Sequence, residues 1–281
     1  MPDRRIFLLR YDTEWNNPRG DRRPPPPGDA TVVKGYHSLE SMAGFFEKVV
    51  DVHRRDSIPA TFFCQGAAID FREDEFRRFF QEVKDDPLFD LQDHSYSHIG
   101  LGYSRGKPVD VIRADYERSF AAHEHVFGKR PVGISICGTP EGPRLPGFDA
   151  TEKSRSELDM VAGLGVRMIN TCLTGIDESS TFIPYSSLGH PDIMGFPSGY
   201  SDTGWMLRRE HGDPLAYILS EVSRRAEAGR HMPLMLHDWV AWHIAPDREL
   251  SHVQRIVEHA RALGYELVTH RRCLEDEALW K

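Results

Sequence analysis

Hydrophobic and polar positions alternate along this chain with two different periods. Short apolar runs, typical of buried strands, alternate with longer segments whose apolar residues recur every three or four positions, typical of amphipathic helices. The first predicted strand is Ile6–Tyr11, and a helix over Ser38–Arg54 follows it. Repeated strand and helix units indicate a parallel sheet or barrel.

The same alternation continues to the end of the chain. Further strands are expected at Ala60–Cys64, Phe89–Gln92, Val132–Cys137, Val166–Cys172, Ile193–Phe196, Pro233–Leu236 and Glu266–Thr269. Further helices are expected at Phe76–Val83, Asp110–Phe127, Lys153–Leu164, Pro214–Ala228 and His252–Leu263. The sequence shows no internal repeat and no interdomain linker, so we expect a single α/β domain over residues 1–281.

One segment breaks the pattern. Residues 16–35 contain PRGDRRPPPPGD, which cannot form a helix or a central strand. Loops that follow parallel strands line the functional face of such folds. Two interpretations stay open, an ordered loop at the mouth of a site and a surface insertion without fixed structure.

Composition narrows the class of protein. The net charge of −8 argues against a nucleic acid or an anionic membrane as partner. The four cysteines form no C-x-x-C pair, which argues against a zinc ribbon or a disulfide framework and fits reduced thiols. No apolar run resembles a signal peptide or a membrane span, so we expect a cytoplasmic protein. The sequence leaves the oligomeric state open and is compatible with a homo-oligomer.

Histidines and acids follow several of the predicted strands. His94 and His98 stand four apart in QDHSYSH, and on a helical turn this spacing lets both imidazoles converge on a metal. The spacing alone is weak in a chain with 14 histidines, where two exposed helix histidines are the alternative. Asp12 and Glu14 end the first strand and point the same way if the strand continues. Burying both is costly without a cation, and a solvent-facing acidic turn is the alternative.

His237 directly follows the apolar run Pro233–Leu236. The alternative to a functional role is a histidine bonded to a nearby carbonyl group. Taken with the two histidines and the acidic pair, it completes a set that can bind a metal, accept a proton and donate one. Such a set is sufficient for amide hydrolysis.

These motifs resemble the polysaccharide deacetylases, carbohydrate esterase family 4, whose shared region is the NodB-homology domain. The resemblance extends over nearly the whole chain and rests on Asp12–Glu14, Ile58–Phe63, His94–His98, Leu234–His237 and Gly264–Thr269. HSYSH with the preceding ATFF strand is its most specific part. The resemblance implies a distorted parallel (β/α) barrel of about seven strands.

By position, the resemblance implies that Asp12 is the catalytic base and His237 the general acid. It implies that His94 and His98 are ligands of one divalent metal ion. Zn²⁺ is the expected ion, and Co²⁺, Ni²⁺, Fe²⁺ or Mn²⁺ would suit the same donors. The family's third ligand is usually an aspartate directly after the base, whereas some relatives have an Asp-x-Glu form. We therefore expect Glu14 to be the third ligand.

The chain also departs from the family pattern. Ser135 stands where the family usually has an arginine that orients the base, and Arg10 and Arg144 are the candidate substitutes. Met235 takes the position of a leucine that contacts the acyl methyl group. The aspartate that supports the acid is either Asp177 or Asp202.

We further expect Trp15, Tyr200 and Trp205 to contact the substrate. The function implied is a hydrolase of non-peptide carbon–nitrogen bonds that removes an acetyl or formyl group from an amino sugar or a related small amide. The substrate would be a small molecule or an oligosaccharide. One alternative is a cyclic amide, imide or ureide amidohydrolase on the same fold. The other is a non-catalytic carbohydrate-binding barrel.

Overall fold

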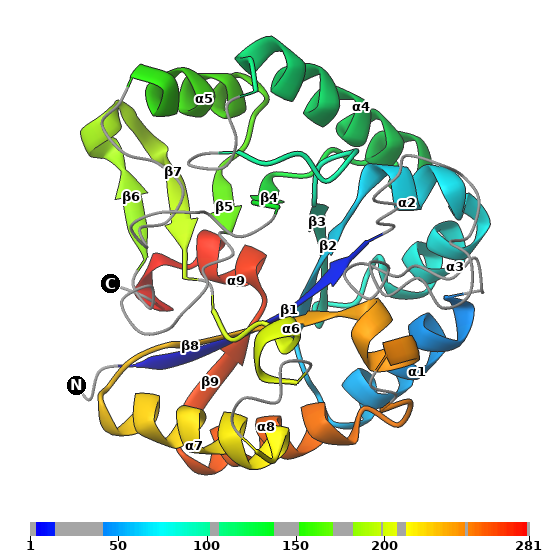
Figure 1. The fold of residues 1–281 in the computed structure, drawn as a ribbon, viewed down its shortest axis with the longest axis vertical. Helices are drawn as coiled ribbons and strands as arrows, with labels where there is room; N and C mark the ends of the chain where they lie inside the picture. Colours follow the sequence, from blue (N-terminus) through cyan, green and yellow to red (C-terminus); the bar gives the residue numbers. More distant parts are fainter. Residues whose placement is uncertain are drawn as a thin grey trace.

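A curved and mostly parallel sheet forms the centre of the protein, and most of its helices cover the outer face of that sheet (Figure 1). The computed structural model describes residues 4–14, 42–101, 107–137, 152–170, 182–197, 199–206, 212–244 and 247–279. The proline-rich segment 16–35 and the predicted residues Trp15, Arg144 and Asp177 lie outside these ranges.

The chain alternates strands with helices, as the sequence predicts. The strands are β1 (Arg5–Thr13), β2 (Ala60–Cys64), β3 (Phe89–Asp93), β4 (Gly133–Ser135), β5 (Met168–Asn170), β6 (Ile183–Tyr185), β7 (His190–Phe196), β8 (Met232–His237) and β9 (Tyr265–Val268). The α-helices are α1 (Ala43–Arg55), α2 (Gly66–Phe71), α3 (Glu73–Val83), α4 (Val109–Phe127), α5 (Glu152–Gly163), α6 (Asp202–Trp205), α7 (Pro214–Glu227), α8 (Ser251–Ala262) and α9 (His270–Glu275). Short turns complete the set, η2 (Ser186–Leu188), the π-helical η3 (Val240–Ile244) and η4 (Glu277–Leu279).

The strand order confirms the fold class expected from the sequence. The sheet runs β6-β7-β5-β4-β3-β2-β1-β8, and every neighbouring pair except β6 and β7 is parallel. β9 pairs with the first half of β1, and β2 pairs with its second half. Within the described residues, the two ends of the sheet do not pair along their length. A single bridge between Ser201, which follows β7, and Met235 of β8 connects the two sides, so the barrel is distorted.

The alternation of side chains along β1 divides the core into two layers. Phe7, Leu9 and Tyr11 belong to the large apolar cluster under the outer helices α1, α3, α7 and α8. Ile6 and Leu8 belong to a smaller cluster with side chains of β5 and β7, on the inner side of the sheet. Burying each such side chain contributes about 1.5–3 kcal/mol. β1 is thus fixed from both sides, and α9 lies within the curve of the sheet (Figure 1).

Most predicted elements are found within a few residues of their expected bounds. The helix expected from Ser38 begins at Ala43 within the described residues. The sequence reasoning missed α2, α6, α9 and the antiparallel strand β6. Within the described ranges, no helix combines the length and the apolar character needed to cross a membrane.

Candidate functional site

The end of β1 carries the acidic pair. Asp12 lies in β1 and Glu14 directly follows its last residue, Thr13, and the two are only 2% and 7% exposed. The parallel register places Asp12 beside His237 at the end of β8. Neighbouring parallel strands end at the same edge of a sheet, which is why residues far apart in sequence meet here.

The two histidines of the HSYSH motif lie on a loop, which corrects the helical turn that we expected. His94 directly follows β3, and both Ser95 and His98 have left-handed backbones, with φ of 57° and 61°. Asp93 accepts the backbone N–H of Ser95 at 2.7 Å, and Asp115 of α4 accepts N–H groups within the loop at 2.8 and 3.2 Å. Such backbone conformations cost of order 1–3 kcal/mol each and concentrate at functional sites.

A single carboxylate oxygen lies at the centre of the site. Oε1 of Glu14 is 3.0 Å from Nε2 of His94 and 3.1 Å from Nε2 of His98. The same oxygen is 3.8 Å from Nε2 of His237, and Oδ2 of Asp12 is 3.8 Å from Nε2 of His94. Candidate ligand atoms of Asp12, Glu14 and His94 all lie within 4.8 Å of one another. Two imidazole nitrogens and a carboxylate oxygen are the donor set of many three-ligand zinc sites.

The protons on these histidines compensate the buried carboxylate of Glu14. Burial alone would raise the pKa of Glu14, but the charges of His98 and His237 and the hydrogen bonds from His94 and His98 hold it well below its usual value. Burial likewise opposes the charge of His98, but Glu14 raises the pKa of this imidazole above its usual value.

The pKa of His94 is set by the same two opposing effects, burial and neighbouring charges. Burial lowers the pKa of His94, but the neighbouring Cys137, Asp12 and Glu14 outweigh it and raise the pKa to about 10. Metal ligands must be deprotonated, so a cation that binds here would take the place of the protons. The site therefore has the charge and the geometry to hold a divalent cation.

The two carboxylate oxygens of Asp12 differ in their hydrogen bonding. Its Oδ2 accepts a hydrogen bond from Nη2 of Arg10 at 3.0 Å. Its Oδ1 is buried and has no hydrogen-bond partner among the described residues. A buried unpaired oxygen is unfavourable by itself, and such atoms are expected where a substrate, a water or an ion completes the site.

His237 is held in place by Asp202. The two carboxylate oxygens of Asp202 accept from the ring Nδ1 of His237 at 2.6 Å and from its backbone N–H at 2.7 Å. Burial lowers the pKa of His237, but Asp202, Glu14 and Asp12 raise it to about 10. The structure thus places Asp202 in the supporting position for which Asp177 was the other candidate.

Tyr200 and Trp205 belong to the packed core instead of lining the cluster of candidate ligands. The Trp205 indole donates to the carbonyl of Tyr200 at 3.0 Å, and the Tyr200 hydroxyl donates to Glu221 at 2.8 Å. Both side chains are buried. Their expected contact with a substrate stays a prediction, as does that of Trp15.

Comparisons with known proteins support the fold. Residues 34–142 match the family model of the polysaccharide deacetylases, and this region contains the HSYSH motif. The fold is similar to a proposed polysaccharide deacetylase from Mycobacterium smegmatis, with 13% identity, a TM-score of 0.69, and coverage of 98% of this chain and 90% of that one. It is also similar to PuuE allantoinase, with 16% identity, a TM-score of 0.63, and coverage of 96% and 88%. The search of curated proteins found no significant match.

Residues 34–142 are thus similar to the polysaccharide deacetylases, and the chain shares the fold of solved structures from that family. This family consists of hydrolases that act on carbon–nitrogen bonds, which is the enzyme class expected from the sequence. The deacetylase fold does not by itself guarantee activity. The fold is also similar to that of a family 4 pseudoenzyme from Bacillus anthracis, with 13% identity, a TM-score of 0.55, and coverage of 99% of this chain and 67% of that one. Whether this chain is active therefore depends on the side chains of the site.

Arg10 lies where it can take the place of the arginine that the family usually has at the position of Ser135. Ser135 is buried, and its hydroxyl has no hydrogen-bond partner in the described part of the chain. Arg10 occupies the buried position beside Asp12, and its Nη2 also contacts the sulfur of Met235. The guanidinium group that holds the candidate base thus comes from β1 itself. Met235 contacts this group, so its predicted contact with an acyl group stays untested.

Two further residues of the candidate site were not singled out from the sequence. The Trp239 indole donates to Oε2 of Glu14 at 3.1 Å. Oδ1 of Asp238 accepts the backbone N–H of Glu14 at 3.5 Å and that of Trp239 at 2.8 Å. Burial and the nearby Glu14 raise the pKa of Asp238 to about 8. The only indication in the sequence was that both residues directly follow His237.

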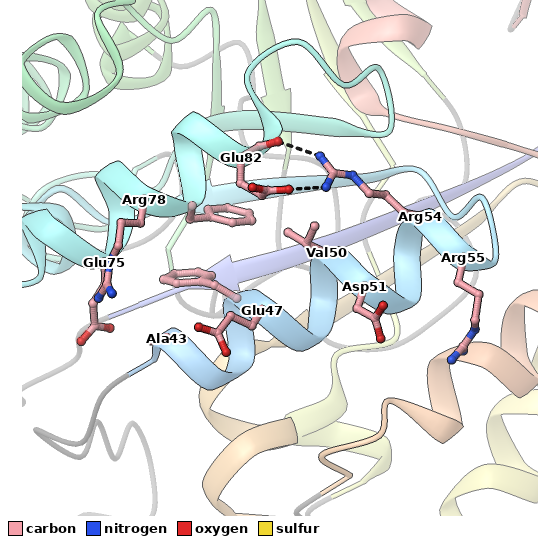
Figure 2. A pocket seen from close by; sticks show the side chains of 11 residues that line it. Ala43, Glu47, Val50, Asp51, Arg54, Arg55, Glu75, Arg78 and Glu82 are labelled. Carbon is pink, nitrogen blue, oxygen red and sulfur yellow. Dashed lines mark hydrogen bonds and ion pairs between the residues drawn. The ribbon is translucent and has the colours of Figure 1, made fainter.

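A groove on the outer surface, away from the candidate site, has a volume of about 620 Å³ (Figure 2). Phe46, Val50 and Phe79 of α1 and α3 lie between the helices, and the paired Arg54 and Glu82 lie at the rim. None of the residues that line it belongs to the candidate site. Arg54 and Glu82 bind each other there, and none of the lining residues has a buried side-chain atom without a partner, in contrast to the end of β1.

Proposed function

We propose that this protein is a metal-dependent hydrolase that removes an N-acyl group from an amino sugar or a related small amide. The observation that carries the proposal is the approach of one Glu14 oxygen to the Nε2 atoms of His94 and His98, at 3.0 and 3.1 Å, beside Asp12 and His237. Binding alone would not need a separate proton acceptor and proton donor on either side of such a cluster.

His94, His98 and Glu14 would hold one divalent cation. Three protein ligands leave coordination positions open, as in catalytic zinc sites, and Zn²⁺ is the expected ion. Co²⁺, Ni²⁺, Fe²⁺ and Mn²⁺ accept the same donors. When bound, the cation polarises the scissile carbonyl, makes water more acidic and stabilises the negative charge that develops on oxygen.

Asp12 has the arrangement of a general base. Arg10 holds Oδ2, so Oδ1 is the oxygen left to accept a proton from the attacking water. The same ion pair fixes the carboxylate plane, and correct placement of a base matters as much as its basicity. Arg10 therefore acts as a positioning residue for Asp12.

His237 has the arrangement of a general acid. Its Nδ1 is bound to Asp202 at 2.6 Å, so Nε2 is the atom that faces the cluster. The raised pKa, about 10, keeps a proton on this imidazole at neutral pH. Nε2 can then deliver that proton to the leaving nitrogen, which an amide requires because an amine anion is a poor leaving group.

A second candidate is the opening of a cyclic amide, imide or ureide on the same groups. The similarity to an allantoinase structure supports it at the level of the fold. Ring opening uses the same base, acid and cation, so only the substrate differs. The cytoplasmic location is a separate proposal that rests on the sequence.

A substrate panel tests the proposed function. Zinc-loaded protein would be incubated with N-acetyl and N-formyl amino sugars, chitin oligosaccharides, and cyclic imides and ureides, and released acetate, formate or ring-opened product would be quantified. We expect turnover of at least one class, its loss after chelation and its return with added Zn²⁺. Fully loaded protein that hydrolyses no class would contradict the proposal and favour a non-catalytic barrel.

A further inference from the structure

The chain just after β8 holds the candidate ligand Glu14 at two points. The Trp239 indole donates to the carboxylate oxygen Oε2 at 3.1 Å. Asp238 accepts the backbone N–H groups of both Glu14 and Trp239, at 3.5 and 2.8 Å. Glu14 lies beyond the last residue of β1, so these contacts fix a segment that the sheet itself does not hold.

The two oxygens of Glu14 consequently have different environments. Oε1 faces the Nε2 atoms of His94 and His98 at 3.0 and 3.1 Å. Oε2 is directed to the indole of Trp239. A carboxylate that chelates an ion through both oxygens would have to turn Oε2 away from the indole. That turn would leave a buried N–H donor unpaired, which is unfavourable.

The indole itself has little freedom to follow such a turn. Trp239 is 3% exposed, and its ring centroid lies 5.2 Å from that of His237. The π-helical turn η3 begins at the next residue. Turns of this kind are rare in proteins, and many of them occur at functional sites. There they place a side chain that a regular helix would direct elsewhere.

We infer that Trp239 is a positioning residue that makes Glu14 a single-oxygen ligand and so favours Zn²⁺ over Mn²⁺ at this site. Zinc is satisfied by few ligands at short distances, whereas manganese suits a fuller shell of oxygen donors. A second Glu14 oxygen would therefore benefit Mn²⁺ more than Zn²⁺. The inference rests on the proposed metal site.

Trp239→Phe tests this inference because it keeps an aromatic ring and removes only the N–H donor. Trp205→Phe is the matched control, since Trp205 is equally buried at 3% and also loses an indole bond, to the carbonyl of Tyr200 at 3.0 Å. Dissociation constants for Zn²⁺ and Mn²⁺ would be measured by competition with a chelating dye. Circular dichroism would verify that each variant is folded.

We expect Trp239→Phe to weaken Zn²⁺ binding about 10–100-fold, as loss of groups that orient ligands typically does. Mn²⁺ binding should weaken less, so the Zn²⁺ to Mn²⁺ preference falls, while Trp205→Phe leaves both constants unchanged. Equal weakening of both ions, or no weakening, would overturn the inference and leave the proposed function standing. Wild-type protein that binds neither ion would instead overturn the proposed site itself.

A structure of the Zn²⁺-loaded wild type gives a second test that does not depend on how the variant folds. We expect Oε1 of Glu14 on the ion and Oε2 still bonded to the Trp239 indole. A Glu14 that chelates the ion through both oxygens would contradict the inference.

Discussion

Two arginine–carboxylate pairs in this protein have the same chemistry and very different surroundings. Arg10 and Asp12 lie inside the sheet at the candidate site, with side chains 2% and 3% exposed. Arg54 and Glu82 lie at the rim of the outer groove, with side chains 38% and 58% exposed (Figure 2). Water can replace either partner of the exposed pair, whereas removing one buried partner leaves a charge that nothing solvates.

The contrast between the two pairs indicates which region of the molecule is suited to a reaction. The groove offers space, but Arg54 is already bonded to both Glu82 and Asp86. The inner pair leaves an atom unused, because Oδ1 of Asp12 has no hydrogen-bond partner among the described residues. Buried polar atoms that converge without partners locate a reactive site better than the volume of a cavity does.

The largest effect is expected at Asp12. Asp12→Asn should lower turnover on the order of 10²–10⁴-fold, the usual cost of losing a general base, and should keep the bound metal. Asp51→Asn at the outer groove is the matched control and should leave turnover unchanged. Steady-state kinetics with elemental analysis would measure both. Loss of the metal in Asp12→Asn would show that Asp12 is a ligand and that its role has been exchanged with that of Glu14.

A similar loss is expected at His237, but only for amides. His237→Ala should reduce amide turnover on the order of 10²–10⁴-fold and reduce activated-ester turnover much less, because the stabilised phenolate of such an ester leaves without protonation. The acid must be protonated, so wild-type activity should fall as pH rises through about 10, and the variant should lack this limb. Equal losses on amide and ester would mean that His237 has another role.

The two arginine pairs should differ most clearly in stability. Arg10→Met leaves Asp12 buried and unpaired, so we expect a loss of about 3–5 kcal/mol in the free energy of unfolding. Arg54→Met breaks an exposed pair, for which about 0.2–1 kcal/mol is typical. Urea denaturation of both variants measures the contrast. Comparable losses in the two variants would show that burial of the inner pair has little energetic consequence.

A smaller effect is expected in the pH dependence of stability. The pKa of His237 is about 10 in the folded protein, above the unfolded value of about 6.5. The stability it contributes is therefore fully present below pH 6.5 and is lost as pH rises through about 10. Asp202→Asn removes the main partner of His237. In this variant the free energy of unfolding should fall less steeply with pH, by up to about 1.4 kcal/mol per pH unit. Denaturation without metal between pH 7 and 9.5 measures this slope. An unchanged slope would contradict the coupling of His237 to Asp202.

The sequence predicted the long periodic elements and missed those fixed by distant contacts. Ala60–Cys64 is found as predicted, because a buried apolar run between turns has few other structures open to it. The four-residue helix α6 has no period of its own. Its first residue, Asp202, is held by His237, which lies 35 positions further along the chain. Short elements of this kind depend on the tertiary structure that they help to form.

The candidate site, too, was predicted from the sequence only in part. The spacing of His94 and His98 correctly indicated that they lie together, but the reason was wrong, because the segment is a loop. Asp115 supports this loop by accepting the backbone N–H groups of Tyr96 and Ser97, a role that no local pattern reveals. Arg10 remained one of two candidates, although its position two residues before Asp12 on a strand already placed both on one side.

Metal content decides whether Glu14, His94 and His98 hold a divalent cation. Wild type, the double variant His94→Ala with His98→Ala, and Glu14→Ala would be loaded with Zn²⁺, dialysed and measured by elemental analysis. We predict about one tightly bound ion per wild-type chain, none in the double variant and weakened binding in Glu14→Ala. Full metal retention by the double variant would contradict the account.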